Sequence, residues 1–296
     1  MANNIGWGNV GTNGFGSIYS RSNSGETDLA GETSPFQDAS VAYSLRDLGL
    51  GATSVVRVRR STDNAEEDFT ANEITDGTLT TFCGAGDGFV SVLYDQKNNN
   101  NASQPLAMRQ PLIVNNGVLN TKNTKPSILF NGTTHVMQSP SGVLGLTAIF
   151  NSYTVGSFEE TSTANKTFFG ISNGGYSSRD NWLVLRKLNG SNNFIVRGNI
   201  ARNLDNGLVN LNQKIFLTKY IALDKISLDI NNTTEEATTN IPTELHLSQY
   251  IDIGALDNDG TFVVFGNINF QELIIFNENS SSEEIKENIN NHYAIY

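Results

Sequence analysis

The chain has 296 residues and a formal net charge of −11, with 30 acidic side chains against 19 Lys and Arg. This balance argues against nucleic-acid binding, which needs clustered cations to displace counterions from phosphates. Cys83 is the single cysteine, so the sequence excludes an internal disulfide and offers no zinc-site spacing. The apolar runs are far shorter than the ~20 residues that span a bilayer, and the N-terminus lacks signal-peptide character. We therefore expect a soluble protein, made in a cytoplasm, with no membrane insertion.

Residues 1–37 differ from the rest of the chain, because Gly, Ser and Asn dominate and no apolar period is sustained. Such a segment cannot form a core of its own. We expect an extended arm for attachment, followed by one domain at residues 38–296. Trp7, Phe15 and Tyr19 are the expected anchors of the arm on a neighbouring subunit, and a disordered tail is the alternative.

The segment "DASVAYSLRDLG" opens the domain with apolar side chains at helical spacing, at Val41, Leu45 and Leu48. The glycine that ends it, Gly49, is a helix stop. The pattern therefore predicts a short helix. A second short helix is predicted at "TDGTLTTFCG", where another glycine closes the run.

Charged side chains are concentrated in "VVRVRRSTDNAEEDF", although only 17% of the chain is charged. Alternation in its first half predicts a half-buried strand, and the acidic residues that follow are expected on a loop that folds back. The planar guanidinium suits bidentate carboxylate pairing, so we interpret the stretch as a structural ion-pair network, with a ligand site as the alternative. Its members are Arg57, Arg59, Arg60, Asp63 and Asp68. An Arg59→Ala variant is then expected to damage folding rather than binding.

The rest of the chain reads as short apolar segments separated by Asn, Gly, Ser and Thr turns, which is typical of a sandwich or jelly roll. No long helical pattern alternates with them, so a βα architecture is not expected. The segment "GFVSVLYDQ" is the first of these strands, and a polar loop at residues 95–103 follows it. The further predicted strands are Ser127–Phe130, Leu144–Phe150, Thr167–Ile171, Trp182–Leu188, Asn193–Gly198, Lys214–Ala222, Lys225–Ile230, Thr261–Phe265 and Asn269–Phe276.

The C-terminal stretch "SSEEIKENINNHY" returns to a helical period. Ser281 and Glu284 match a capping box, and Ile285, Ile289 and Tyr293 form an apolar stripe. We expect one short terminal helix that packs on the sandwich.

Candidate catalytic groups are few. His135, His246 and His292 stand far apart in unrelated contexts, so no Ser/His/Asp constellation is indicated. The sequence has neither a phosphate loop nor a dinucleotide fingerprint. We expect no cofactor.

The segment "ALDNDGTF" supplies hard oxygen ligands from Asp257, Asn258 and Asp259, followed by Gly260. Calcium takes about six to eight such oxygens, but the longer loop and closing Glu of an EF-hand are absent from the sequence. D-N-D-G is also an ordinary hairpin turn. We favour the turn and keep calcium as the alternative.

The block "AYSLRDLGLGATSVVRVRRSTDNAEEDFT", followed by "FCGAGDGFVSVLYDQKNNNNASQ", resembles the front half of fungal and bacterial α-L-arabinofuranosidase catalytic domains. Those domains carry a comparable V-R-R-x-S-D-N…D, F-x-G-x-x-x-x-V and Y-D-Q-S-G-x-x-N. The block is also similar to one in bacteriophage proteins with a laminin-G-like jelly roll, and "GNINFQELIIFNENSSSEEIKENINNHYAIY" resembles the closing strand and helix of such domains. The resemblance implies an all-β, concanavalin A-like (laminin-G-like) jelly-roll sandwich over about residues 40–296.

The enzymatic part of the resemblance is incomplete. The arabinofuranosidase pocket includes a disulfide between adjacent cysteines, which a chain with Cys83 alone cannot form. The family's acid/base aspartate matches Asp257, but its nucleophilic Glu has no counterpart around Trp182–Leu188. The resemblance thus implies the scaffold more than the activity.

The opening "NIGWGN…GFGSIYSRSNSGETDL" is similar to openings of proteins from phages of Bacteroidetes. Together these resemblances imply a non-enzymatic virion structural protein, a capsid or tail decoration or a fibre component, assembled in the host cytoplasm. Its arm would bind other virion proteins, its jelly roll would bind host-surface glycan, and it would form a homo-oligomer. The alternative is an α-L-arabinofuranosidase-like glycoside hydrolase that uses Asp257.

Glycan sites in concanavalin-type folds use loops at the sheet rim, with aromatic rings for sugar faces and Asp or Asn for hydroxyls. Tyr176, Trp182, Asp257 and Asp259 are therefore the expected ligand-binding residues. The alternation around Trp182 equally suits a core position.

Overall fold

The computed structural model describes residues 34–172, 182–197, 200–243, 245–247, 250–258, 260–278 and 282–296. Residues Ser34–Tyr296 form one compact unit. The unit therefore includes residues 34–37, which the sequence analysis assigned to the arm, and Phe36 is buried in it. The expected arm anchors Trp7, Phe15 and Tyr19 lie outside the described residues.

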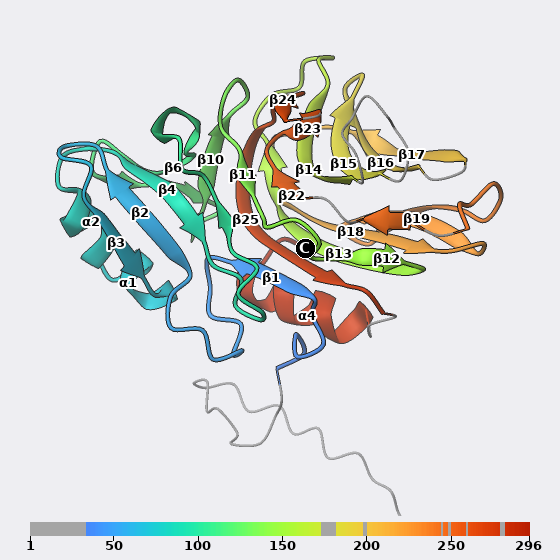
Figure 1. Ribbon diagram of the computed structural model, residues 1–296, viewed down its shortest axis with the longest axis horizontal. Helices are drawn as coiled ribbons and strands as arrows, with labels where there is room; N and C mark the ends of the chain where they lie inside the picture. The colour runs from blue at the N-terminus through green and yellow to red at the C-terminus, as the bar shows by residue number, and fades with distance from the viewer. Residues whose placement is uncertain are drawn as a thin grey trace, which may run out of the picture. The chain divides into compact units, whose positions relative to one another are not determined.

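The unit is an all-β jelly-roll sandwich, as predicted, and its two layers are visible in Figure 1. Neighbouring strands pair antiparallel throughout the described sheets. One layer runs in the order β3 (Glu66–Phe69), β2 (Val56–Arg60), β4 (Gly88–Leu93), β6 (Leu112–Asn115), β10 (Ile128–Asn131), β25 (Asn267–Phe276), β13 (Ile149–Phe158), β18 (Lys214–Ile221), β19 (Lys225–Ile230) and β20 (Thr233–Ala237). The other runs β5 (Ala102–Ser103), β11 (Met137–Gln138), β22 (Ile251–Ile253), β14 (Lys166–Ser172), β15 (Trp182–Leu188), β16 (Ser191–Arg197) and β17 (Ala201–Leu208).

Smaller elements complete the unit. They are β1 (Val41–Ser44), α1 (Ala71–Thr75), α2 (Thr78–Cys83), η1 (Ala107–Arg109), β7 (Val118–Leu119), β8 (Thr121–Lys122), β9 (Lys125–Pro126), β12 (Gly145–Thr147), β21 (Leu245–Leu247), β23 (Leu256–Asn258), β24 (Thr261–Val263) and α4 (Ser282–Tyr293). The predicted helix at "TDGTLTTFCG" is confirmed as α2. No helix among the described residues is long and apolar enough to cross a membrane.

The helix predicted for the segment that ends at Gly49 is wrong. Its first half is strand β1, which pairs antiparallel with β25 from Val41 opposite Ile275 to Ser44 opposite Glu272. All four β1 residues are buried, with Val41 and Tyr43 in one core and Ala42 in the other. Burial on both faces and the open edge of β25 override the helical spacing.

The acidic half of the charged stretch is also more regular than predicted. Glu66–Phe69 forms strand β3 rather than a loop, and it pairs along β2 from Val56 opposite Phe69 to Arg59 opposite Glu66. A capping box at Thr70 and Glu73 then starts α1, which the sequence analysis did not predict.

Most predicted strands are observed within a few residues of their expected bounds, and β15 and β19 have the predicted bounds. The predicted strand Leu144–Phe150 is wrong as a unit, because it divides between β12 and the longer β13. Strands β17 and β20 were not predicted. Their side chains are mostly polar and exposed, so they carry little apolar alternation.

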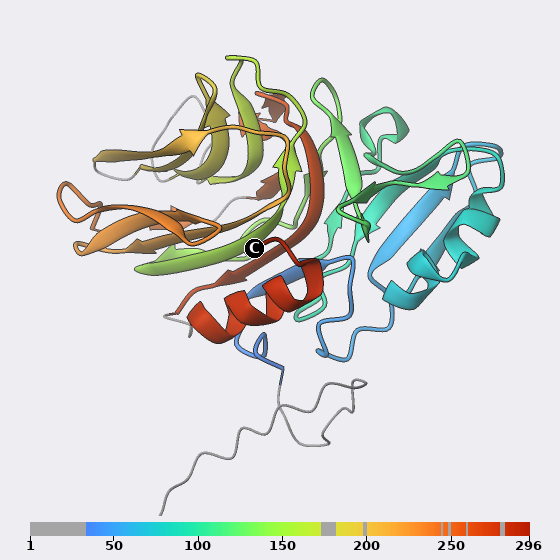
Figure 2. The same ribbon diagram turned by 180° about the vertical axis from the view of Figure 1, so that it is seen from behind.

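Two large apolar cores and one small cluster lie in the described part of the sandwich. The larger lies between the layers, and its centre is an aromatic cluster of Phe130, Phe158, Phe168, Phe216 and Phe270. The smaller lies under α4, which crosses the outer face of the layer that contains β1, β13 and β25 (Figure 2). The predicted apolar stripe of α4, Ile285, Ile289 and Tyr293, is buried there. The expected cap residue Ser281 lies outside the described residues.

Candidate functional site

Two bidentate ion pairs lie in the charged stretch. Arg57 donates to Asp68 through Nε at 2.7 Å and Nη2 at 2.9 Å, and Arg60 donates to Asp63 through the same two nitrogens at 2.7 Å each. The hydrogen bond from Arg60 holds the pKa of Asp63 at about 2. The hydrogen bond from Arg57 likewise lowers the pKa of Asp68. Both pairs are exposed to solvent, where water and salt screen the attraction, so neither contributes much to the stability of the fold.

Arg59 departs from the predicted network, because no carboxylate of the described residues pairs with it. Its Nε donates to Gln110 Oε1 and its Nη1 to Asn64 Oδ1, both at 2.7 Å. The guanidinium also lies over the ring of Phe89, 5.0 Å from the centroid. Arg59 thus links β2 to the side-chain amides of Gln110 and Asn64, which carry no charge.

Asp257, the residue matched to an acid/base, lies in a hairpin formed by β23 and β24. Its Oδ1 accepts a hydrogen bond from the N–H of Gly260 at 2.7 Å, and Gly260 has a φ of 83°. This is the turn that the sequence analysis favoured. Leu256 of the same hairpin packs on Val184 and Ile195 of the sheet beneath. The carboxylate of Asp257 therefore helps to shape the turn.

A second carboxyl group holds this hairpin from below. Asp252 on β22 is only 3% exposed and accepts hydrogen bonds from Gln138 Nε2 at 2.8 Å and from the N–H of Asp257 at 2.9 Å. Burial raises the pKa of Asp252 to about 8, although both hydrogen bonds act in the opposite direction. Asp252 is thus a buried acid, and each of its two carboxyl oxygens accepts a hydrogen bond from another part of the chain.

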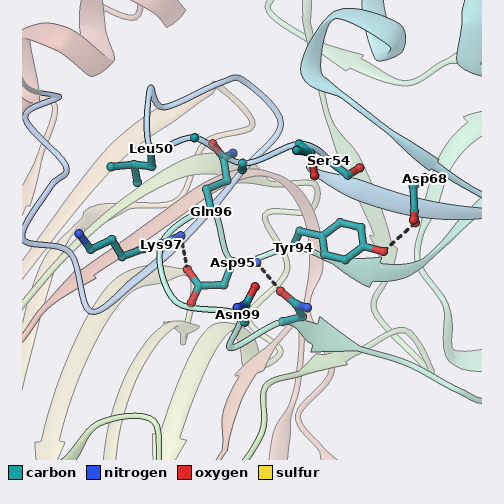
Figure 3. Close-up of a pocket in the computed structure, with 12 residues that line it drawn as sticks. Leu50, Ser54, Asp68, Tyr94, Asp95, Gln96, Lys97 and Asn99 are labelled. Carbon is teal, nitrogen blue, oxygen red and sulfur yellow. Dashed lines mark hydrogen bonds between the residues drawn. The ribbon is translucent and has the colours of Figure 1, made fainter.

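A polar pocket of about 380 Å³ opens between two loops, shown in Figure 3. One loop, residues 50–54, joins β1 to β2, and the other, residues 94–101, joins β4 to β5. Asp68 of β3 completes the wall, and its Oδ1 accepts a hydrogen bond from Tyr94 Oη at 2.6 Å. Burial and this hydrogen bond raise the pKa of Tyr94 to about 12, so the phenol stays protonated at neutral pH. We refer to this cavity as the loop pocket.

Asp95 fixes the second loop of the loop pocket. Its Oδ1 accepts hydrogen bonds from the N–H groups of Ala42 at 2.9 Å and Lys97 at 3.1 Å. Its Oδ2 accepts from those of Asn98 at 3.2 Å and Asn100 at 3.1 Å. A carboxylate with four backbone donors holds a loop that has no regular secondary structure of its own.

Gln96 fixes the same loop to the segment that follows β1. Its Nε2 donates to the carbonyls of Ser44 at 3.1 Å and Arg46 at 2.8 Å, and its Oε1 accepts from the N–H of Leu48 at 3.0 Å. The Y-D-Q sequence that resembles the arabinofuranosidase motif thus has a structural role in orienting the pocket wall.

Several polar groups of the loop pocket keep free hydrogen-bonding capacity. Among the described residues we find no hydrogen bond to the ammonium group of Lys97, the amide group of Asn99 or the hydroxyls of Thr53 and Ser54. In Figure 3 the Lys97 side chain lies on the side of the pocket opposite the hydrogen-bonded Tyr94 and Asp68 pair, and Asn99 lies between them. The pocket therefore combines the carboxylate of Asp68, which Arg57 and Tyr94 hold in place, with the ring of Tyr94 and with unpaired donors on its other residues.

Of the sequence-predicted ligand residues, only Asp257 has a side chain that the structure describes. Tyr176 and Asp259 lie outside the described residues, and Trp182 is on β15 with a side chain that is not described. Asp257 lies in its hairpin, and it does not line the loop pocket. None of the residues of the "YDQKNNNN" loop that line the pocket was predicted as a ligand residue, although the loop is a polar, motif-bearing segment of the sequence.

Metal-binding geometry is not seen in the described part of the chain, where no group of three or more His, Cys, Asp or Glu side chains converges. His292 packs edge-on against Tyr293, and burial lowers the pKa of His292 to about 4. Burial also lowers the pKa of His135, whose Nδ1 lies 3.4 Å from the carbonyl oxygen of Leu129.

The sequence matches no protein-family model and no curated protein. The fold is similar to two solved structures of GH54 α-L-arabinofuranosidase, one soaked with a cyclic sulfate inhibitor (TM-score 0.64, 13% identity) and one a mutant soaked with 4-nitrophenyl α-L-arabinofuranoside (0.60, 14%). Each match covers 89% of this chain and 65% of the other. A CBM40 of the Ruminococcus gnavus IT-sialidase, bound to α2,3-sialyllactose, matches 47% of this chain and 80% of its own (0.40, 12%).

These comparisons bear on the fold alone, because the identities are low. The resemblance to arabinofuranosidases found in the sequence is confirmed at the level of the sandwich. The chain spans about two thirds of the length of those structures, at 65%. None of the comparisons supports a bacteriophage origin.

Proposed function

We propose that the jelly-roll unit is a non-catalytic carbohydrate-binding domain and that the loop pocket binds a sugar residue. The observation that carries the proposal is the pocket itself, whose volume of about 380 Å³ lies in the ~300–1,000 Å³ range of small-molecule sites. Such sites are usually mostly apolar. A pocket lined by carboxylate, amide, ammonium and hydroxyl groups favours a ligand with many hydroxyls instead.

The chemistry of the wall suits a neutral sugar. Asp68 is kept ionised by Arg57 and accepts hydroxyl donors, while Lys97 and Asn99 donate to ring and hydroxyl oxygens. Tyr94 adds a ring face next to a bound ligand. Asp95 fixes the loop of residues 94–101, which carries Lys97 and Asn99, before a ligand arrives, and this reduces the entropy lost on binding.

The likeness to sandwiches of carbohydrate-active proteins supports the same proposal. The two arabinofuranosidase structures with a similar sandwich were soaked with a cyclic sulfate inhibitor and with 4-nitrophenyl α-L-arabinofuranoside. A hydrolase is not favoured for this chain. The carboxylate of Asp257 caps a hairpin turn, and Cys83 has no second cysteine with which to form the disulfide that the resemblance implies.

The role as a virion component stays a proposal, supported by the Gly/Asn-rich opening and its similarity to phage proteins. In this role the first residues attach to other virion proteins and the sandwich binds host-surface glycan, with calcium as an optional ligand of the Asp257 turn. Mass spectrometry of purified virions, together with the genes that flank this one, tests it. Absence of the chain from virions, or a polysaccharide-degradation cluster around the gene, would contradict this role.

Saturation-transfer NMR against a panel of neutral methyl pentofuranosides and hexopyranosides tests sugar binding. We expect at least one glycoside to bind the wild-type protein, and Lys97→Gln and Asn99→Gly to weaken its affinity about tenfold each. Glycine is chosen at residue 99 because Asn99 has a φ of 59°, which glycine adopts without strain.

Asn240→Gly is the matched control, because Asn240 has a φ of 56°, is exposed and does not line the loop pocket. It should leave affinity unchanged. Absence of binding to every glycoside, or equal affinity in the pocket variants and the control, would reject the pocket as the site. Turnover of 4-nitrophenyl α-L-arabinofuranoside would reject the non-catalytic assignment.

A further inference from the structure

Strand β1 has two edges, and the second one faces the loop pocket. Its first edge pairs with β25. On the other edge the N–H of Gln96 donates to the carbonyl of Ala42 at 2.9 Å, and the N–H of Ala42 donates to Asp95 Oδ1 at 2.9 Å. Tyr43 and Asp95 also form an isolated antiparallel bridge. The first strand is therefore held between β25 and the loop of residues 94–101, which forms one wall of the pocket.

Side chains add further links between this wall and the segment around β1. Asn98 Nδ2 donates to the carbonyl of Ser40 at 3.0 Å, and Tyr43 Oη donates to the carbonyl of Asn100. The three hydrogen bonds of Gln96 reach the end of β1 and the segment that follows it. Gln96 is 4% exposed and Tyr43 is fully buried, so both side chains lose their partners in the fold if the wall and β1 separate.

The wall has few other attachments. Among the described residues, every hydrogen bond that residues 96–100 form outside their own loop goes to residues 40–48. Their remaining hydrogen bonds go to the carboxylate of Asp95, to which the N–H of Ala42 also donates. If β1 leaves β25, the loop thus loses the residues that fix its conformation.

The opposite wall depends on β1 through the chain itself, because residues 50–54 join β1 to β2. This connection begins near Leu48, whose N–H donates to Gln96 Oε1 at 3.0 Å and whose carbonyl accepts from Ser34 Oγ at 2.6 Å. Separation of β1 from the first wall breaks the link to Gln96. Both loops that enclose the pocket therefore depend on the docking of β1.

We propose that β1 and the two loops of the loop pocket form one cooperative unit, which opens without unfolding the rest of the sandwich. The pocket then exists only while β1 is docked on β25. Proteins commonly open in units of this kind, at free energies below that of global unfolding. Residues 34–40 lead into β1, so a partner that displaces this segment would release a bound sugar from the pocket. This consequence rests on the proposed sugar binding, whereas the cooperative unit itself does not.

Native-state hydrogen exchange of the full chain in sub-denaturing urea, without any sugar, tests the cooperative unit. The N–H groups of Ser40 and Leu45, which donate to carbonyls of β25, report on the docking of β1. Those of Gln96 and Lys97 report on the pocket wall. We expect the four groups to share one opening free energy and one urea dependence. Both quantities should lie below those of amides on β16, which we expect to exchange only by global unfolding.

Val41→Ala should speed exchange of both sets of amides by the same factor, about tenfold or more, because it removes buried methyl groups from β1. Val196→Ala on β16 is the matched control, since Val196 is equally buried in the same core and lies outside the opening unit. It should speed exchange on β16 and leave both sets unchanged.

Different opening free energies for the β1 and wall amides in the wild type would overturn the proposal, and this comparison needs no variant. Opening of β1 only together with β16, or wall exchange that does not respond to Val41→Ala, would overturn it too. Failure of the loop pocket to bind any neutral glycoside would reject the proposed function and leave the cooperative unit intact.

Discussion

Arg46 donates two hydrogen bonds to the carboxylate of Glu272, from Nε to Oε2 at 2.8 Å and from Nη2 to Oε1 at 3.2 Å. The two residues are 226 positions apart in the sequence. The Glu272 side chain is fully buried and that of Arg46 is 13% exposed. Ser44 donates to the same carboxylate at 2.7 Å, and Arg46 also donates to Asn288 of α4 at 2.8 Å. The guanidinium also lies over the rings of Phe36 and Tyr293, 5.4 and 5.7 Å from their centroids. This pair joins the start of the unit, its last strand and its terminal helix.

Replacing Glu272 should therefore destabilise the whole unit. Glu272→Ala leaves the Arg46 guanidinium buried without its carboxylate, and breaking a buried pair in this way costs ~3–5 kcal/mol. Urea unfolding measures the change. Glu236→Ala, which removes the partner of Lys225 in an exposed pair at 3.0 Å, is the control and should cost ~1 kcal/mol or less. Equal losses in the two variants would contradict the structural role of Glu272.

The contrast between these pairs explains what the sequence could predict. Arg57 and Asp68 were found because charge is locally dense around them, and they do pair. Arg46 and Glu272 form the more buried pair, yet Glu272 is an isolated charge on its strand and the acid next to Arg46 in the sequence is Asp47. No local pattern links two residues that the fold alone brings together.

Burial also explains why Val41–Ser44 forms a strand instead of the predicted helix. Val41 and its neighbours fit a helical period, but the missing partner was the edge of β25, more than 200 residues away, and local spacing carries no information about it. Strands with clear apolar runs, such as β15 and β19, were predicted because their pattern is local. The loop pocket was missed for the same reason as the Arg46 pair, since β3 contributes Asp68 to loops from other parts of the chain.

Arg59 should matter for stability, but less than a buried ion pair would. Arg59→Ala removes the donor to Gln110 Oε1, and Gln110 is only 2% exposed. The unpaired amide oxygen should cost ~1–3 kcal/mol, measured by urea unfolding. Sugar affinity at the loop pocket should not change, because Arg59 does not line it. A loss of affinity at unchanged stability would contradict this assignment.

Asp95 should control the loop pocket through its four backbone hydrogen bonds. Asp95→Ala leaves the N–H groups of Lys97, Asn98 and Asn100 without their acceptor, so the loop of residues 94–101 should lose its fixed conformation. We expect faster hydrogen exchange at these three amides and a drop in sugar affinity of about tenfold. Asp95→Asn keeps one acceptor oxygen and should fall between Asp95→Ala and the wild type. Unchanged exchange in Asp95→Ala would show that the loop does not depend on this carboxylate.

Asp252 should make the stability of the unit depend on pH. Its pKa is raised from 3.8 to about 8 in the folded state, chiefly by burial, so between these values the folded chain holds a proton that the unfolded chain has released. The free energy of unfolding then falls as pH rises through this window, by up to ~1.4 kcal/mol per pH unit for this group, and levels off above pH 8.

Asp252→Asn removes this titration. The asparagine keeps an acceptor for the N–H of Asp257, and its amide donates to Gln138 once that side chain rotates to present its oxygen. The variant should resemble the wild type in stability near pH 4 and exceed it increasingly up to pH 8, measured by urea unfolding at each pH. Asp224→Asn, at an exposed position, controls for the loss of one negative charge and should show a constant difference. A constant difference for Asp252→Asn as well would mean that this carboxyl titrates in the folded unit as it does in the unfolded chain.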